Sequence, residues 1–175
     1  MRGKERGGKM IVIEVTGTPK GQPRARAFYK PGLGVRMYDP GQAEGWKGQV
    51  AVAAHSSLPA VPMAGPIGVE IMFRFPRPKC HYRTGKHAGE LRQDAPYWHT
   101  VKPDRDNAEK AVLDCLTQIG MWRDDCQVCH GEVAKVWAET GGATIKIVER
   151  QEARQLEAQR FKTIRAQSQK GHTEQ

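Results

Sequence analysis

Apolar and polar residues alternate along parts of the chain, and this spacing predicts β-strands. The clearest case is residues 67–75, where apolar side chains occupy every second position and Glu70 and Arg74 fall on the other side. Other apolar runs predict four further strands, at residues 10–15, 35–38, 127–137 and 143–148. The pair Gly141-Gly142 predicts a hairpin between the last two of these strands.

Two other segments show the spacing of three to four residues that is typical of an amphipathic helix. Over residues 106–119, one apolar stripe is formed by Ala108, Ala111, Val112, Cys115, Leu116 and Ile119. Asp106 is expected at the N-cap with Glu109 completing a capping box, and Gly120 is expected to end the helix. A second helix is expected over residues 39–55, starting at an Asp-Pro pair and burying Trp46, Val50 and Ala54.

The length of 175 residues suits one domain, which we expect over residues 10–150, between a basic extension (1–9) and a charged tail (151–175). Residues 76–100 show no periodicity, and a loop of this length is usually functional or disordered. No apolar run has the length of a membrane span or of a signal peptide. We therefore expect a cytoplasmic protein without a membrane partner.

The net charge of the chain indicates what kind of partner it binds. A net charge of +9 and a pI of about 9.6 make a polyanion the first partner to consider, because neutralising phosphates releases counterions. Residues 104–125 run against this trend, since they hold six acids and three bases, a net charge of −3. Hard divalent cations prefer carboxylate oxygens, so the cluster favours a metal site. Its acids are Asp104, Asp106, Glu109, Asp114, Asp124 and Asp125.

The spacing of these acids reduces the number of candidate metal ligands. Asp104 and Asp106 are two residues apart, so in an extended backbone both carboxylates face one ion. Lys110 follows one helical turn later, where its ammonium would stabilise charge on a phosphate. Adjacent strand residues point opposite ways, so only one of Asp124 and Asp125 is expected to join the pair, and spacing leaves open which. A cap, an ion pair or a turn explains any single acid, but together they favour metal-dependent phosphodiester hydrolysis.

Other chemistries have weaker signals. The chain has no Ser-His-Asp or Cys-His arrangement and no Walker or Rossmann glycine pattern. Cys126-x-x-Cys129 followed by His130 suggests zinc, but a closed site needs a fourth ligand and Cys115 is expected on a buried helix face. Two alternatives stay open: a zinc-stabilised protein, and a catalytically inactive module that binds branched DNA.

Two ordered blocks of sequence carry a resemblance to a known family. Residues 102–116 read Lys-Pro-Asp-Arg-Asp-Asn-Ala-Glu-Lys-Ala-Val-Leu-Asp-Cys-Leu, and residues 120–128 read Gly-Met-Trp-Arg-Asp-Asp-Cys-Gln-Val. This pattern resembles the RusA family of Holliday junction resolvases. The resemblance extends more weakly to residues 17–26 and to Lys135, and so covers most of residues 10–150.

The resemblance implies a small α+β homodimer in which a mixed β-sheet packs against helices. It also implies an endonuclease that nicks four-way DNA junctions in pairs during recombination and repair, with Mg²⁺ or Mn²⁺ as cofactor. Metal-binding and catalytic roles are implied for Asp104, Asp106 and Asp125, and a catalytic role for Lys110. The setting it implies is a bacterial or phage-infected host cell.

The basic residues complete this hypothesis. The cations expected to hold the junction arms are Lys20, Arg24, Arg26, Arg77, Lys79, Arg83, Lys86 and Lys135. The long loop at residues 76–100 stays open between a flap that contacts DNA and a loop that only a partner orders. As a flap, its Tyr82 or Trp98 would stack on an unpaired base.

Overall fold

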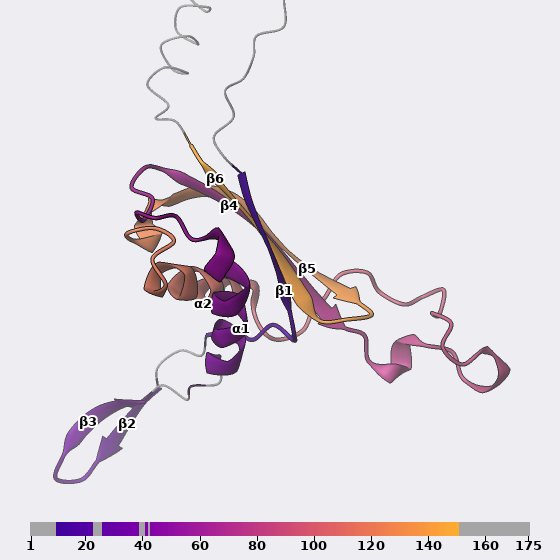
Figure 1. Ribbon diagram of the computed structural model, residues 1–175. Coiled ribbons are helices and arrows are strands. Elements are labelled where there is room, and N and C mark those ends of the chain that lie inside the picture. The colour runs from indigo at the N-terminus through magenta and orange to yellow at the C-terminus, as the bar shows by residue number, and fades with distance from the viewer. Residues whose placement is uncertain (1–9, 23–25, 39–40, 42, 151–175) are drawn as a thin grey trace, which may run out of the picture.

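A mixed four-stranded sheet with two helices on one face forms the body of the protein (Figure 1). The computed structural model describes residues 10–22, 26–38, 41 and 43–150. Its strands are β1 Met10–Thr16, β2 Arg26–Lys30, β3 Gly34–Tyr38, β4 Ile67–Pro76, β5 Val128–Ala138 and β6 Gly142–Glu149. Its helices are α1 Glu44–Ala54 and α2 Arg105–Gln118, with short 3-10 turns η1 His55–Ser57, η2 Lys79–His81, η3 Gly85–His87 and η4 Asp125–Gln127. The expected α+β class is confirmed.

The strand order of the sheet is β1-β6-β4-β5. β4 and β5 are parallel, whereas β6 pairs antiparallel with both β1 and β4. Parallel neighbours need a crossover connection, and α2 provides it between β4 and β5. The helix therefore runs back along the sheet, so that its first residue lies near the end of β5 and its last residue near the start of β5.

The expected hairpin between the last two strands is wrong. Both strands form, but β4 lies between them and pairs with each. Gly141 and the start of β6 instead connect to β1, since Gly17 donates its N–H to the Gly141 carbonyl at 3.2 Å. A pair of glycines indicates that the chain turns, but it does not determine which strands pair. The order of the strands depends on which strand buries the most apolar surface. That strand is β4, whose core-facing residues are all buried.

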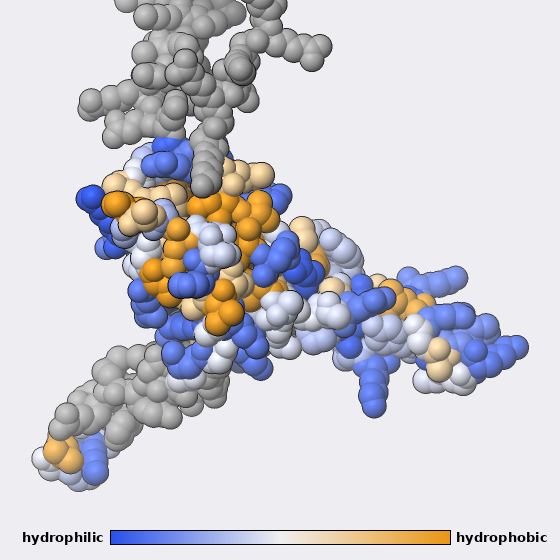
Figure 2. Space-filling view, viewed as in Figure 1, coloured by the Kyte–Doolittle hydropathy of each residue, from blue (hydrophilic) through white to orange (hydrophobic). Residues whose placement is uncertain are grey.

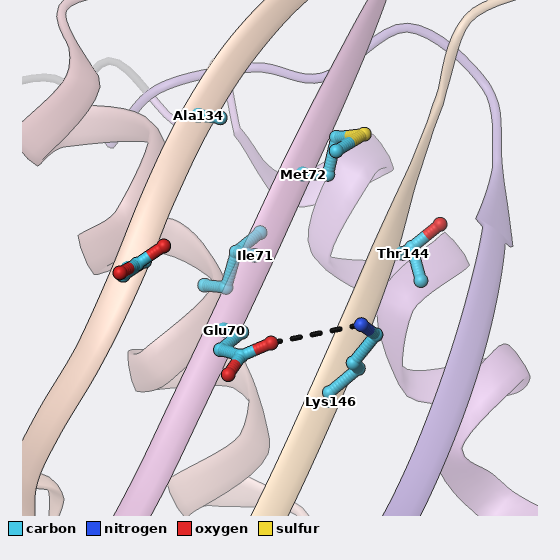
Figure 3. Close-up of a pocket in the computed structure, with 7 residues that line it drawn as sticks. Glu70, Ile71, Met72, Ala134, Thr144 and Lys146 are labelled. Carbon is cyan, nitrogen blue, oxygen red and sulfur yellow. Dashed lines mark ion pairs between the residues drawn. The ribbon is translucent and has the colours of Figure 1, made fainter.

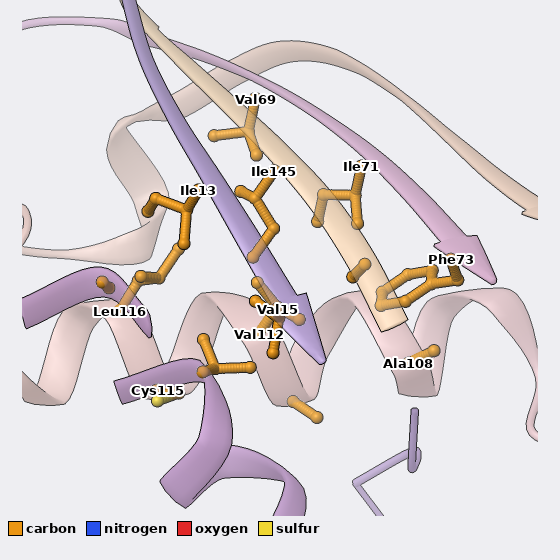
Figure 4. Packing of buried hydrophobic residues seen from close by; sticks show 14 of the residues in the cluster. Ile13, Val15, Val69, Ile71, Phe73, Ala108, Val112, Cys115, Leu116 and Ile145 are labelled. Carbon is orange, nitrogen blue, oxygen red and sulfur yellow. The ribbon is translucent and has the colours of Figure 1, made fainter. Parts of the chain in front are cut away.

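The core lies between the sheet and the two helices (Figure 4). From the sheet come apolar residues of three strands, namely Ile13, Val15, Val69, Ile71, Phe73, Ile145 and Ile147. The helices contribute Trp46, Val50 and Ala54 of α1 and Ala108, Ala111, Val112, Cys115 and Leu116 of α2, all buried as the stripes predict. Burying each large apolar side chain contributes about 1.5–3 kcal/mol. This packing fixes α2, and with it the acidic cluster, on the sheet.

The opposite face of the sheet mixes exposed apolar residues, among them Met10, Val12 and Met72, with charged side chains that form cross-strand ion pairs. Arg74 contacts Glu14 at 2.8 Å, and Lys146 contacts Glu70 at 3.6 Å (Figure 3). A shallow pocket on this face is lined by Glu70, Met72, Thr144 and Lys146 among others. Because α2 lies on the other face, this pocket is separate from the acidic cluster by the thickness of the sheet.

The helix starts differ from those expected. α1 begins at Glu44 with Ala43 at its N-cap, and the predicted Asp-Pro start falls at residues 39–40, outside the described residues. In α2 the N-cap is Asp104 and not Asp106, and neither the expected capping box nor any other side-chain capping bond forms there. Gly120 ends the helix with a φ of +80°, as predicted.

Two segments project from this body (Figure 1). One is a β2–β3 hairpin, in which β3 was expected and β2 was not. The other is the connection of residues 77–104 between β4 and α2, which we call the arm; most of its surface is hydrophilic (Figure 2). The arm is ordered by its own contacts, including a bridge between Tyr82 and Leu91. Among the helices of the described residues, none is long and apolar enough to cross a membrane.

Candidate active site

Asp104 and Asp106 lie at the N-terminus of α2, where the arm returns to the body. Asp104 has extended backbone angles (φ −64°, ψ 150°) as the N-cap, and Asp106 is the second residue of the helix. Both side chains are exposed. The positive end of the helix dipole favours carboxylates at this place. The pair therefore presents two carboxylates to solvent on a rigid helix start.

The segment of residues 17–22, which follows β1, packs against this helix start. The Gln22 N–H donates to the Asn107 carbonyl at 2.8 Å. A Cβ added at Gly21 would lie 2.9 Å from the Cβ of Pro103 and 3.1 Å from the Cβ of Asn107. A residue with a side chain would push the segment away, so Gly21 allows its close packing against the residues that flank Asp104 and Asp106.

Lys135 on β5 reaches the same helix start. Its ammonium donates to the Val101 carbonyl at 2.8 Å and to the Pro103 carbonyl. It also lies 5.9 Å from the ring centroid of Phe75. Burial lowers the pKa of the Lys135 ammonium below its ordinary value, and the nearby Asp104 carboxylate opposes this shift. Lys135 therefore holds the backbone that leads into Asp104.

The two adjacent aspartates ahead of β5 have different roles. Asp124 caps η4, since its carboxylate accepts a hydrogen bond from the Cys126 N–H at 2.9 Å. Hydrogen bonds from the Cys126 thiol and backbone lower the pKa of the Asp124 carboxyl. The Gln127 side chain completes the capping box and also donates to the Met63 and Gly65 carbonyls. Asp124 is thus used by the local fold, which leaves the exposed Asp125 as the better ligand candidate.

The structure does not bring Asp125 to Asp104 and Asp106 within one chain. Asp125 precedes the start of β5, whereas Asp104 lies beside Lys135, seven residues after Val128 on that strand. At about 3.3 Å per strand residue, these ends are about 20 Å apart. Within the described part of the chain, no three His, Cys, Asp or Glu side chains are close enough to hold a metal ion. The expectation that Asp124-Asp125 returns toward the pair fails because α2 separates them.

The absence of a metal-binding group of His, Cys, Asp or Glu among the described residues also bears on the zinc alternative. Cys126, Cys129 and His130 are exposed at the start of β5, and both thiols are free. His130 instead lies 3.3 Å from the Arg150 guanidinium. Cys115 is buried in the core as expected, and burial raises the pKa of its thiol. The described residues therefore give the zinc hypothesis no assembled site.

Lys110 lies one turn into α2 and contacts Asp114 at 3.1 Å. An ion pair between residues four apart on a helix is the simpler, structural explanation for this lysine. Its side chain is 59% exposed, and an exposed pair of this kind is worth only about 0.3–0.5 kcal/mol. The ammonium can exchange Asp114 for a phosphate at little cost.

The other predicted cations are spread over the surface. Lys20, Lys79 and Lys86 are exposed, Arg83 pairs with Glu90 at 2.8 Å, and Arg77 donates to the Pro96 carbonyl at 2.7 Å. Arg26 begins β2. Arg24 lies outside the described residues.

Comparison with known proteins adds the family. The family model described as Endodeoxyribonuclease RusA matches residues 16–148, which is most of the 175-residue chain. The chain belongs to the RusA endodeoxyribonuclease family. It is therefore a hydrolytic endonuclease that acts on DNA, of the class that resolves Holliday junctions. The search of curated proteins found no match.

The region that matches the RusA endonuclease model contains both the acidic cluster of residues 104–125 and the arm. Two residues support the site through contacts that the sequence did not predict. Lys135 was expected to bind DNA, yet its contacts are to backbone carbonyls. Gln127 gave no signal, because its importance depends on carbonyls more than 60 residues away.

Proposed function

We propose that this RusA-family protein is a Mg²⁺- or Mn²⁺-dependent homodimer that resolves four-way DNA junctions by paired cleavage in recombination and repair. The observation that supports this best is the exposed pair Asp104 and Asp106, set on a helix N-terminus at the base of a cationic arm. A Mg²⁺ site typically uses one or two carboxylates, with water and phosphate oxygens as its other ligands. The donor set of this pair fits that need.

The charged residues around the start of α2 then have separate roles. Asp104 and Asp106 would hold the ion, and Lys110 would neutralise charge that develops on the phosphate in the transition state. A bound divalent ion supplies a nucleophilic water at neutral pH and stabilises charge on the phosphate oxygens. Lys135 would keep the Val101 and Pro103 carbonyls, and so Asp104, in place.

Asp125 enters this scheme through the dimer. The 14 residues of α2 span about 21 Å, too far for Asp125 to join Asp104 in its own chain. A twofold axis relates two identical surfaces, and two cuts on opposite strands need two sites so related. We infer that the carboxylate set is completed by the Asp125 of a second copy, which would make dimerisation a requirement for cleavage.

Cleavage of synthetic DNA tests the proposed function directly. With Mg²⁺, the protein should cut a four-way junction symmetrically and leave a linear duplex of the same sequences intact. With EDTA, it should bind the junction and not cut it. Binding without nicking in Mg²⁺ would favour an inactive module that binds branched DNA, and equal cutting of duplex would contradict structure specificity.

Lys135→Met tests whether this lysine positions Asp104 or contacts DNA. Hydrogen bonds to charged groups contribute about 1.5–3 kcal/mol, so we expect cleavage to slow about 10- to 100-fold. Junction affinity in EDTA should stay within about twofold. The control is Lys20→Met at an exposed, predicted phosphate contact, which should weaken binding and reduce its salt slope by about 1. If Lys135→Met behaved like Lys20→Met, Lys135 would be a phosphate contact instead.

A further inference from the structure

Residues 97–99 of the arm lie along the outer edge of the sheet. β5 is an edge strand, and Trp98 forms an antiparallel bridge with Val136 on its free side. The Trp137 N–H donates to the Tyr97 carbonyl at 2.9 Å, and the His99 N–H donates to the Lys135 carbonyl at 3.0 Å. The backbone of this segment is therefore fixed by the sheet.

The rings next to this backbone differ sharply in exposure. His99 is only 6% exposed and stacks on Phe75, with ring centroids 3.7 Å apart, and it also contacts Trp137. Tyr97 and Trp98 are 54% and 58% exposed, and their rings meet edge to face at 4.9 Å. The buried aromatic rings anchor the segment, while the exposed pair presents a large aromatic surface to solvent. Such a surface on a rigid support marks an interaction site.

This exposed pair is close to the acidic cluster. Lys135, which accepts the His99 N–H, is the residue whose ammonium holds the carbonyls ahead of Asp104. The six residues from Trp98 to Asp104 span at most about 20 Å even when fully extended. Stacked nucleotides rise about 3.4 Å each, so a base on Trp98 would lie within about six nucleotides of a phosphate at Asp104.

The charge of the arm favours nucleic acid over a second copy of this chain at the exposed pair. Residues 77–104 contain six Lys or Arg and three Asp or Glu, a net charge of +3. Two of those acids are already paired, Glu90 with Arg83 and Asp94 with Arg92. A twofold contact through the arm would bring like charges together, whereas a DNA backbone would be attracted to them.

We propose that Tyr97 and Trp98 form a stacking platform for a nucleobase that is unstacked at the branch point of the junction. This platform rests on the proposed function, and it would explain how the protein distinguishes a branch point from a duplex. In duplex DNA every base is already stacked and paired, so the platform has no free base to bind. At a branch point, stacking on an aromatic ring replaces the base's lost neighbour. Tyr82 does not share this role, since it is half-buried within the arm.

Trp98→Ala, measured in EDTA, tests the platform. We expect its Kd for a four-way junction to rise about 5- to 100-fold, because base–aromatic stacking is lost. Its Kd for linear duplex should change less than about twofold. Trp98→Phe should retain most of the affinity, and Leu91→Ala, which changes another exposed apolar residue of the arm, should bind as wild type. Unchanged thermal unfolding would show that the fold is intact.

Junctions with an abasic position at the branch point sharpen this test. If Trp98 stacks on that base, its removal should weaken wild-type binding by the same factor and leave Trp98→Ala unaffected. Equal losses for both proteins at every branch position would overturn the platform. So would a Trp98→Ala protein that binds the junction normally but no longer dimerises, since the patch would then be a subunit contact. Wild-type cleavage of the junction in Mg²⁺ is tested separately, so failure of the platform and failure of the proposed function are distinguishable.

Discussion

Asp106→Asn should lower the rate of junction cleavage at least about a thousandfold, while junction binding in EDTA stays within about twofold. The amide keeps the size of the side chain but loses the negative charge that a hard divalent cation requires. Losing the ion removes several kcal/mol of transition-state stabilisation. The cationic surface that holds DNA is unchanged, so affinity should survive. Single-turnover cleavage and a gel-shift titration measure the two effects.

A matched substitution controls for the loss of one charge. Asp94→Asn makes the same chemical change on the arm, where the carboxylate pairs with Arg92 at 2.9 Å. Exposed pairs of this kind contribute little, so cleavage should stay within about threefold of wild type. Substantial cleavage by Asp106→Asn would remove the metal role from this residue. A parallel loss of junction binding would instead point to misfolding or to a general role in DNA binding.

Local patterns in the sequence predicted much of the fold because they depend on burial on one face. The apolar stripe of α2 and the alternation along β4 both follow the spacing of their own backbone, and both are buried as expected. The hairpin between β5 and β6 failed, since no local pattern states that β4 lies between them. The predicted N-cap of α2 was wrong by two residues, because Asp104 and Asp106 are both residue types that cap helices well.

The candidate site likewise contains some residues whose position follows from local sequence and others whose position depends on topology. Asp104 and Asp106 are neighbours in sequence, so their common position at the start of α2 follows from local structure. Asp125 would be a neighbour only if the chain had already returned along α2 before reaching it, but β5 makes that return and begins after Asp125. Lys135 shows the opposite case, because a residue 31 positions after Asp104 lies beside it through the parallel pairing of β4 and β5. Such placements depend on topology, which single-sequence patterns do not contain.

Pairing two inactive variants should restore cleavage if each site takes Asp125 from the partner subunit. Asp106→Asn and Asp125→Asn homodimers should each be inactive, since every site lacks one carboxylate. In a heterodimer of the two, one site collects both substitutions and the other is intact. Purified through two different affinity tags, this heterodimer should nick junctions at about half the wild-type rate. Because one site acts alone, its product should be a nicked junction and not two resolved duplexes.

The reciprocal heterodimer makes the test decisive. A wild-type chain paired with a chain carrying both Asp106→Asn and Asp125→Asn should be inactive, because each shared site then contains one substitution. If each site were built within one chain, the results would reverse: this heterodimer would keep one working site and the first would keep none. Asp124→Asn serves as the neighbouring control, since its carboxylate caps η4. That variant should lower thermal stability slightly and retain cleavage, which separates a local cap from a residue that a partner's site requires.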